Sequence, residues 1–113
     1  MSSMGRRLRT RPPGSLLRDR VLPTLGLSVS QAARDLQITR QTLHRILAGD
    51  AAITPDMATR LERFCGIHSR FWLGLQQDFE LERISTQYRD LYDRIPLHPL
   101  PETFLMDLGA IHE

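Results

Sequence analysis

The stretch SVSQAARDLQITRQTLHRILAG, residues 28–49, decides the fold expected for this chain. Ser28 and Gln31 have the spacing of a capping box, in which each side chain binds the backbone N–H of the other residue, so a helix is expected to open at Ser28. Small and apolar residues at helical spacing supply the buried side of that helix: Ala32, Ala33 and Leu36. Because Ala33 is small, another helix can approach it closely.

A second short helix is expected after a link of only two residues, Gln37 and Ile38. Thr39 has the character of an N-cap, the helix is expected to span residues 40–48, and Gly49 is typical of a C-terminal stop. Three apolar residues at spacings of three and four face inward: Leu43, Ile46 and Leu47. The polar residues face outward: Arg40, Gln41, His44 and Arg45.

Two capped helices joined by a tight turn form the layout of a helix-turn-helix, whose second helix lies in the major groove of DNA. Side chains near the start of that helix reach base edges, where Arg40 is suited to guanine and Gln41 to adenine. The sequence therefore predicts contact with double-stranded DNA through one group of residues: Ser28, Thr39, Arg40, Gln41, His44 and Arg45. The alternative for the polar side chains of the second helix is an ordinary solvated helix face.

The charge distribution agrees with a polyanionic partner for one half of the chain. Residues 1–45 hold nine arginines and two acids, a net charge of +7, whereas residues 46–113 hold six arginines and eleven acids, a net charge of −5. Residues 1–13 are predicted to be a flexible basic arm. Its arginines either enter a minor groove or track phosphates, or they only raise the local charge: Arg6, Arg7, Arg9 and Arg11.

The remaining patterns predict an all-α fold of five helices. A first helix is expected from residue 14 or 15 to Pro23, and Thr54-Pro55-Asp56 marks the start of a fourth helix that ends at Gly66. Ser69 is the expected cap of a fifth helix. The expected core anchors of that helix are aromatic or aliphatic: Phe71, Trp72, Leu75 and Phe79. The helix-turn-helix domain is expected to occupy residues 14–82.

Residues 83–113 are predicted to be a C-terminal extension, helical to about residue 95 and proline-rich beyond it. A last stretch around residues 104–108 is expected to form one weak turn or nothing fixed. Apolar residues recur at spacings of three and four in a short heptad-like seam: Leu81, Ile84, Tyr88, Leu91 and Ile95. This seam either packs on its own domain or pairs with a second copy, and a homodimer is the favoured interpretation because it matches a palindromic DNA site.

Other classes of protein find little support in the sequence. No apolar run approaches the ~20 residues needed to cross a bilayer, so no membrane association is expected. The single cysteine, Cys65, excludes an internal disulfide. No spacing suits a metal, and no nucleophile is paired with a base, so the chain is predicted to be neither an enzyme nor a cofactor-binding protein. A cytoplasmic location is expected.

Residues 13–82 resemble the HigA-type antitoxins, a branch of the lambda-repressor-like helix-turn-helix group. The resemblance rests on Pro13-Gly14, on Leu25-Gly26-Leu27-Ser28, on the block Ile53-Thr54-Pro55-Asp56, and above all on residues 71–76, FWLGLQ, followed by Asp78-Phe79-Glu80-Leu81. It implies a homodimer that binds a palindromic operator, usually in front of its own operon, and that neutralises a RelE-like, HigB-like toxin that cleaves messenger RNA.

Three residues depart from the family pattern. Ser15 stands where glutamate is usual, and Val29 stands where a polar residue, often glutamine, commonly meets a phosphate. Gln37 replaces a glycine in the turn, where a left-handed conformation costs a non-glycine residue ~1 kcal/mol. Two alternatives therefore stand beside the antitoxin: a solitary transcription regulator without a toxin, and an interaction module that no longer binds DNA.

Overall fold

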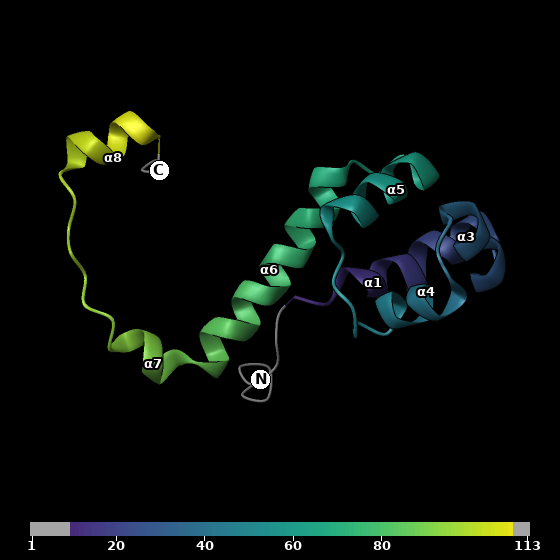
Figure 1. Ribbon diagram of the computed structural model, residues 1–113, viewed down its shortest axis with the longest axis horizontal. Helices are drawn as coiled ribbons and strands as arrows, with labels where there is room; N and C mark the ends of the chain where they lie inside the picture. The colour runs from purple at the N-terminus through teal and green to yellow at the C-terminus, as the bar shows by residue number, and fades with distance from the viewer. Residues whose placement is uncertain (1–9, 110–113) are drawn as a thin grey trace.

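The computed structural model describes residues 10–109, and all regular structure in this range is helical (Figure 1). The elements are α1 (Pro13–Leu16), the π-helical segment η2 (Leu17–Val21), α2 (Leu22–Leu25), α3 (Val29–Leu36), α4 (Arg40–Leu47), α5 (Pro55–Cys65), α6 (Ser69–Gln87), α7 (Arg89–Asp93) and α8 (Glu102–Leu108). No helix in the described range is both long enough and apolar enough to span a membrane.

The segments α1, η2 and α2 form one uninterrupted helical run, which is the first helix of the prediction. That helix was expected to end at Pro23, but it continues to Leu25. In the turn before the proline, the N–H of Leu22 donates to the carbonyl oxygen of Leu17, five residues back. Proline has no N–H to donate, and its ring crowds the turn that precedes it. The wider π-helical turn lies directly before Pro23 and gives the ring room, so the helix continues through Pro23.

The hydrophobic core lies among the helices from α1 to α5 and is closed by one side of α6. Trp72 is fully buried and Phe79 nearly so, as predicted, and Leu75 is half-buried. The prediction for Phe71 was wrong, because its side chain is 51% exposed. Adjacent residues on a helix point about 100° apart. Trp72 takes the inward direction, and Phe71 meets the Trp72 ring edge-on with centroids 6.4 Å apart.

Side-chain oxygens cap three of the helices as the sequence indicated. Ser28 Oγ accepts from the N–H of Gln31 at 3.1 Å, and Thr39 Oγ1 accepts from the N–H of Thr42 at 3.0 Å. Thr54 caps α5 in the same way. The second half of the expected capping box is not formed, because the amide group of Gln31 donates to Asp35 and accepts from Arg34 instead of reaching back to Ser28.

The start of α6 differs from the prediction by one residue. His68, not Ser69, is the N-cap, and its Nδ1 accepts from the N–H of Arg70 at 3.1 Å. The N–H of Ser69 is instead bound by the Glu62 carboxylate of α5, at 3.0 Å. The end of α5 and the start of α6 are therefore joined through a carboxylate.

This contact makes the stability of the α5–α6 junction dependent on pH. The hydrogen bond from Ser69 holds the pKa of Glu62 below its usual range. The stabilisation is therefore present above the pKa of the unfolded glutamate and is lost as the pH falls through the lower pKa of the folded state. We expect the free energy of unfolding to fall more with acid in the parent than in Glu62→Gln, measured by urea unfolding from about pH 6 to about pH 3. Glu102→Gln, in the exposed α8, should retain the parental slope; equal slopes for all three proteins would contradict the assignment.

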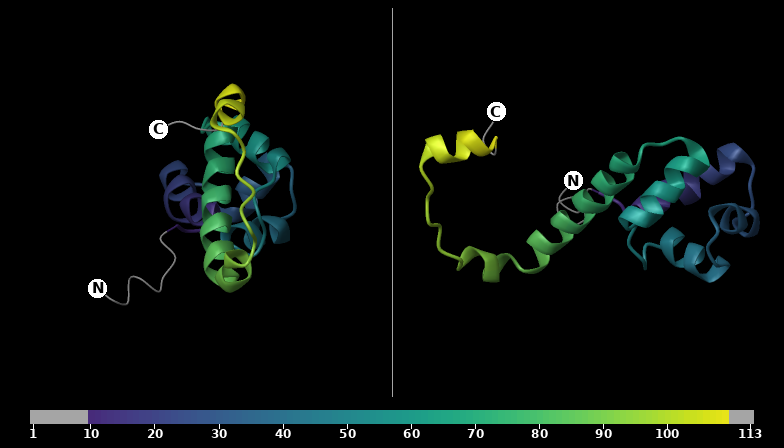
Figure 2. Two further views of the ribbon diagram at one scale, coloured as in Figure 1. Left: turned by 90° about the vertical axis from the view of Figure 1, so that its left-hand side faces the viewer. Right: turned by 45° about the horizontal axis from the view of Figure 1, so that its top comes forward.

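The C-terminal part extends away from the core. The helix α6 continues to Gln87, the backbone breaks at Tyr88, and α7 ends at Asp93. The expected seam is thus divided between two helices. Residues 102–108 form the helix α8, where the sequence indicated at most one weak turn. Figure 1 and the right-hand view of Figure 2 show α8 at the far end of the molecule from α3 and α4.

Candidate nucleic-acid interface

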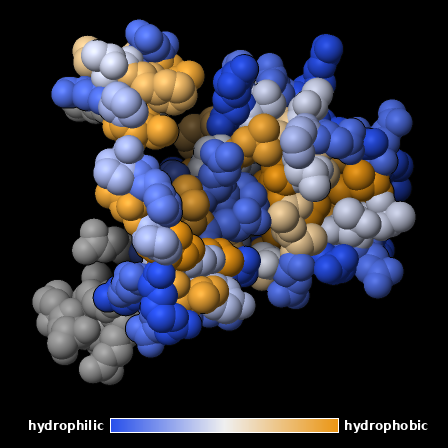
Figure 3. Space-filling model, turned by 60° about the vertical axis from the view of Figure 1, so that its left-hand side comes forward, coloured by the Kyte–Doolittle hydropathy of each residue, from blue (hydrophilic) through white to orange (hydrophobic). Residues whose placement is uncertain are grey.

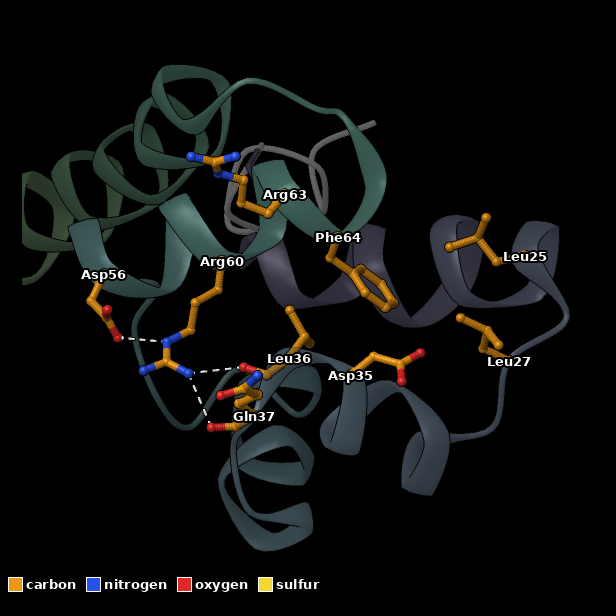
Figure 4. Close-up of a pocket in the computed structure, with 9 residues that line it drawn as sticks. All are labelled: Leu25, Leu27, Asp35, Leu36, Gln37, Asp56, Arg60, Arg63 and Phe64. Atoms are coloured by element: carbon orange, nitrogen blue, oxygen red, sulfur yellow. Dashed lines mark hydrogen bonds and ion pairs between the residues drawn. The ribbon is translucent and has the colours of Figure 1, made fainter.

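The turn between α3 and α4 has the sharp geometry of a helix-turn-helix. Gln37 closes α3 in the left-handed conformation, with φ 60°, and is the only residue other than glycine with a positive φ in the described part of the chain. Arg60 of α5 supports this turn: its Nη1 donates to the carbonyl oxygens of Leu36 at 2.9 Å and Gln37 at 3.0 Å (Figure 4). Asp56 holds the same guanidinium through Nε at 2.9 Å. Arg60 therefore stabilises the turn that lacks the usual glycine.

The start of α4 forms an exposed polar corner. Every predicted contact residue on α4 and its cap is exposed: Thr39, Arg40, Gln41, His44 and Arg45. The opposite side of α4 is anchored in the core by Leu43, Ile46 and Leu47, which are all buried. Because α8 lies at the other end of the molecule, the chain's own C-terminal helix leaves this corner uncovered (Figure 1).

The side chains on this corner differ in how they are held. Arg40 Nη1 donates to Ser30 Oγ of α3 at 3.1 Å, which links the two helices across the turn. Arg45 turns toward the end of α4, where its Nη2 donates to the carbonyl oxygen of Asp50 at 3.2 Å. Gln41 and His44 are exposed, and neither side chain is hydrogen-bonded to another residue between 10 and 109. Gln41 and His44 are thus available to an external partner without breaking an internal contact.

The beginning of α3 contributes a second, smaller part of this surface. Ser28 is exposed and caps the helix. Val29 is half-buried and packs against the core, so the side chain at this position faces the protein and offers no hydrogen-bonding group. Arg34 is exposed and donates to Gln31 at 2.9 Å, without the ion pair to Asp35 that its position allowed.

The predicted basic arm falls mostly outside the described residues. Arg6, Arg7 and Arg9 belong to residues 1–9, and Arg11 is exposed. The segment that follows them is attached to α6, because both the N–H and the hydroxyl of Thr10 donate to Glu82 Oε1, at 2.8 and 2.7 Å.

Three features of this candidate site were not predicted from the sequence. Ser30 positions Arg40, Thr42 is exposed with its hydroxyl accepting from that of Thr39 at 2.8 Å, and Arg60 supports the turn. Ser30 was detectable in principle, because small polar residues in the first turn of α3 face the start of α4. The support of the turn by Arg60 carried no local signal, since the two carbonyl groups that it binds lie more than twenty residues away. No cluster of histidine, cysteine or acidic residues within 10–109 is arranged to hold a metal ion.

The helix pair, its capped turn and its exposed corner define the protein as a helix-turn-helix protein. The sequence profile of the helix-turn-helix family matches residues 17–72. The chain is 34% identical to virulence-associated protein A of Dichelobacter nodosus over 92 residues, which cover 80% of this chain and 90% of that protein. The chain therefore belongs to the XRE-like helix-turn-helix family.

Solved structures confirm the resemblance to HigA-type antitoxins. Antitoxin GraA has 29% sequence identity and a TM-score of 0.76, covering 82% of this chain and 100% of its own. Antitoxin HigA of Pseudomonas aeruginosa, solved with the higBA promoter, has 30% identity and a TM-score of 0.70, covering 80% of this chain and 100% of its own. About a fifth of the present chain therefore has no counterpart in that HigA structure.

Proposed function

We propose that this protein is the antitoxin of a type II toxin–antitoxin pair, which binds a palindromic operator as a homodimer, represses its own operon and neutralises a RelE-like ribonuclease. The observation that carries the proposal is the exposed corner at the start of α4, whose polar side chains extend from a helix anchored in the core. The similarity to HigA, which was solved with a promoter, supports DNA as the partner.

The side chains at the start of α3 and α4 fall into two groups in this proposal: those that contact base edges and those that contact the sugar–phosphate backbone. Gln41 and His44, whose side chains have no hydrogen-bond partner among residues 10–109, are the side chains that we expect to reach base edges. Arg40 exchanges its bond to Ser30 for a guanine or a phosphate. Arg45 is directed along the end of α4 by Asp50, which suits the sugar–phosphate backbone better than a base. Ser28 and Thr39 present helix N-termini to phosphate groups.

We expect the double variant Arg40→Ala, Gln41→Ala to lose its preference for its own operator over a random duplex. A good bidentate base contact is worth ~1–3 kcal/mol, so two contacts account for about two orders of magnitude in affinity or more. The measurement is fluorescence anisotropy with a labelled palindromic duplex taken from upstream of the protein's own gene. The parent's affinity should fall steeply as salt rises, because phosphate contacts release counterions.

Arg63→Ala is the matched control, because it removes an exposed arginine of α5 from another part of the surface. It should leave the preference for the operator intact. A double variant that discriminates as well as the parent would show that the recognition helix is misassigned. Failure of the parent to bind any duplex at low salt would favour the interaction module.

The toxin part of the proposal rests on charge and on the resemblance. Residues 46–113 have a net charge of −5, which suits a cationic protein whose basic surface binds RNA. Co-expression with the reading frame next to this gene should yield a stable complex and relieve growth inhibition by that frame. An intact operator interaction without any such partner would identify the protein as a solitary regulator.

A further inference from the structure

The C-terminal part of the chain exposes a nearly continuous series of large apolar side chains. Ten of the twelve exposed large hydrophobic residues in the described range lie beyond residue 80: Leu81, Tyr88, Leu91, Tyr92, Ile95, Leu97, Leu100, Phe104, Met106 and Leu108. The space-filling view in Figure 3 shows apolar surface both on the α8 lobe and along the segment that leads to it. An apolar surface of this extent marks an interaction site, whereas single exposed hydrophobic residues do not.

The helix α8 has no polar contact with the other helices in the described part of its chain. Phe104, Leu105 and Leu108 share one face, while Thr103 and Asp107 lie on the other. Within residues 10–109, no hydrogen bond or ion pair joins α8 to another helix; its backbone bonds reach only as far as Pro101. A helix of seven residues is marginal in water by itself, so burial of its apolar face must stabilise it.

The connection to α8 works against folding back onto the same domain. Pro96, Pro99 and Pro101 favour an extended chain between α7 and α8. Figure 1 and the right-hand view of Figure 2 show α8 apart from α6, with a curved connection between α7 and α8. The Cα radius of gyration is 18.1 Å, whereas a compact domain of this length has about 13 Å. Within residues 10–109, the apolar face of α8 therefore remains exposed and is available to the surface of another molecule.

The charged residues of the C-terminal part favour a second copy of this chain as the partner that covers α8. Arg89 and Arg94 lie at the two ends of α7, Asp90 and Asp93 lie between them, and Glu102 and Asp107 lie in α8. None of the six forms an ion pair in the described part of a single chain. Both signs thus occur on the same apolar segment. A two-fold interface brings each segment onto its counterpart in a second copy, which makes such a mixed surface self-complementary.

We propose that α8 of one copy packs against the α6–α7 segment of a second copy, and that the exchange is reciprocal. This inference rests on the homodimer of the proposed function, and it assigns a role to a C-terminal segment that the domain's fold does not use. The seam on α6 and α7 then forms the centre of the interface, and each α8 covers the outer side of the partner's helices.

The first test compares two substitutions that add the same charge to the same helix. Phe104→Asp on the apolar face should raise the dimer dissociation constant about tenfold or more, whereas Thr103→Asp on the polar face should leave it nearly unchanged. Sedimentation velocity over a dilution series measures the constant. Equal constants for Phe104→Asp and the parent would overturn the proposal. A parent that is monomeric throughout would instead refute the homodimer of the proposed function.

The second test shows whether α8 packs on its own chain or on another. Phe104 is replaced by the photoreactive benzoylphenylalanine, and ¹⁴N- and ¹⁵N-labelled proteins are mixed, allowed to exchange and irradiated. Cross-linked peptides that join α8 of one isotope to residues 69–95 of the other support the exchange. Cross-links within one isotope only, or none in a sample that is dimeric, would overturn it. Neither readout uses DNA, so a failed operator assay does not affect the result.

Discussion

Replacing Gly14 by alanine is expected to lower the free energy of unfolding by about 3 kcal/mol or more, although alanine is the better helix former. Gly14 is buried in α1, where that helix crosses α4. A Cβ atom there would lie 1.8 Å from the carbonyl oxygen of Ile46 and 2.7 Å from its carbonyl carbon. Both are backbone atoms of α4, so no side chain can move aside, and the two helices must separate. Denaturant unfolding at a fixed protein concentration measures the loss.

Gly74→Ala provides the control for this prediction. Gly74 is also helical, in α6, but a Cβ atom at this position meets nothing within 4 Å. Alanine there should stabilise the protein by roughly 0.5–1 kcal/mol, the ordinary gain for a glycine in a helix. If Gly14→Ala were also neutral or stabilising, the close approach of α1 to α4 would be absent in solution. The Pro13-Gly14 pair of the resemblance would then lack its structural explanation.

The part of the fold that depends on neighbours in the sequence was predictable. The threonine caps at 39 and 54 and the burial of Ala32 and Ala33 follow from local hydrogen bonding and helical spacing. Phe71 was not predictable in this way, because its apolar character is the same whether it faces the core or solvent. Only the packing of Trp72 decides between the two directions. The cap of α6 at His68 was likewise not predictable, because the N–H of Ser69 is bound by Glu62, which belongs to another helix.

The candidate site was also predictable only where local sequence patterns decide the structure. Its exposed residues were identified because the pattern of buried residues on α4 leaves only one face to solvent. The contacts that orient those residues were missed, since Ser30 and Arg60 act across the turn between helices. The helix α8 was missed for a related reason: seven residues between a proline and a glycine give too little local stability to predict a helix.

A substitution in the apolar seam, which is divided between α6 and α7, is the second change with a large expected effect. Leu81 lies nine residues after Trp72, and at about 100° per residue this places it on the face of α6 opposite the core. Its side chain is 67% exposed, so the chain's own domain does not bury it. A carboxylate at this position is hydrated in a single copy but must lose its water at the centre of an apolar interface. Leu81→Asp therefore acts on association and hardly on the folding of each copy.

We expect Leu81→Asp to be monomeric and to bind the palindromic operator about two to four orders of magnitude more weakly than the parent. The loss has this size because a dimer delivers its second recognition helix at the high effective concentration set by the first, and a monomer forfeits that advantage. Light scattering measures the mass and anisotropy measures the affinity, while a single half-site duplex should bind both proteins alike. Thr86→Asp, which adds the same charge to an exposed position of α6 outside the seam, should stay dimeric. A dimeric Leu81→Asp with parental operator affinity would place the two-fold contact elsewhere on the protein.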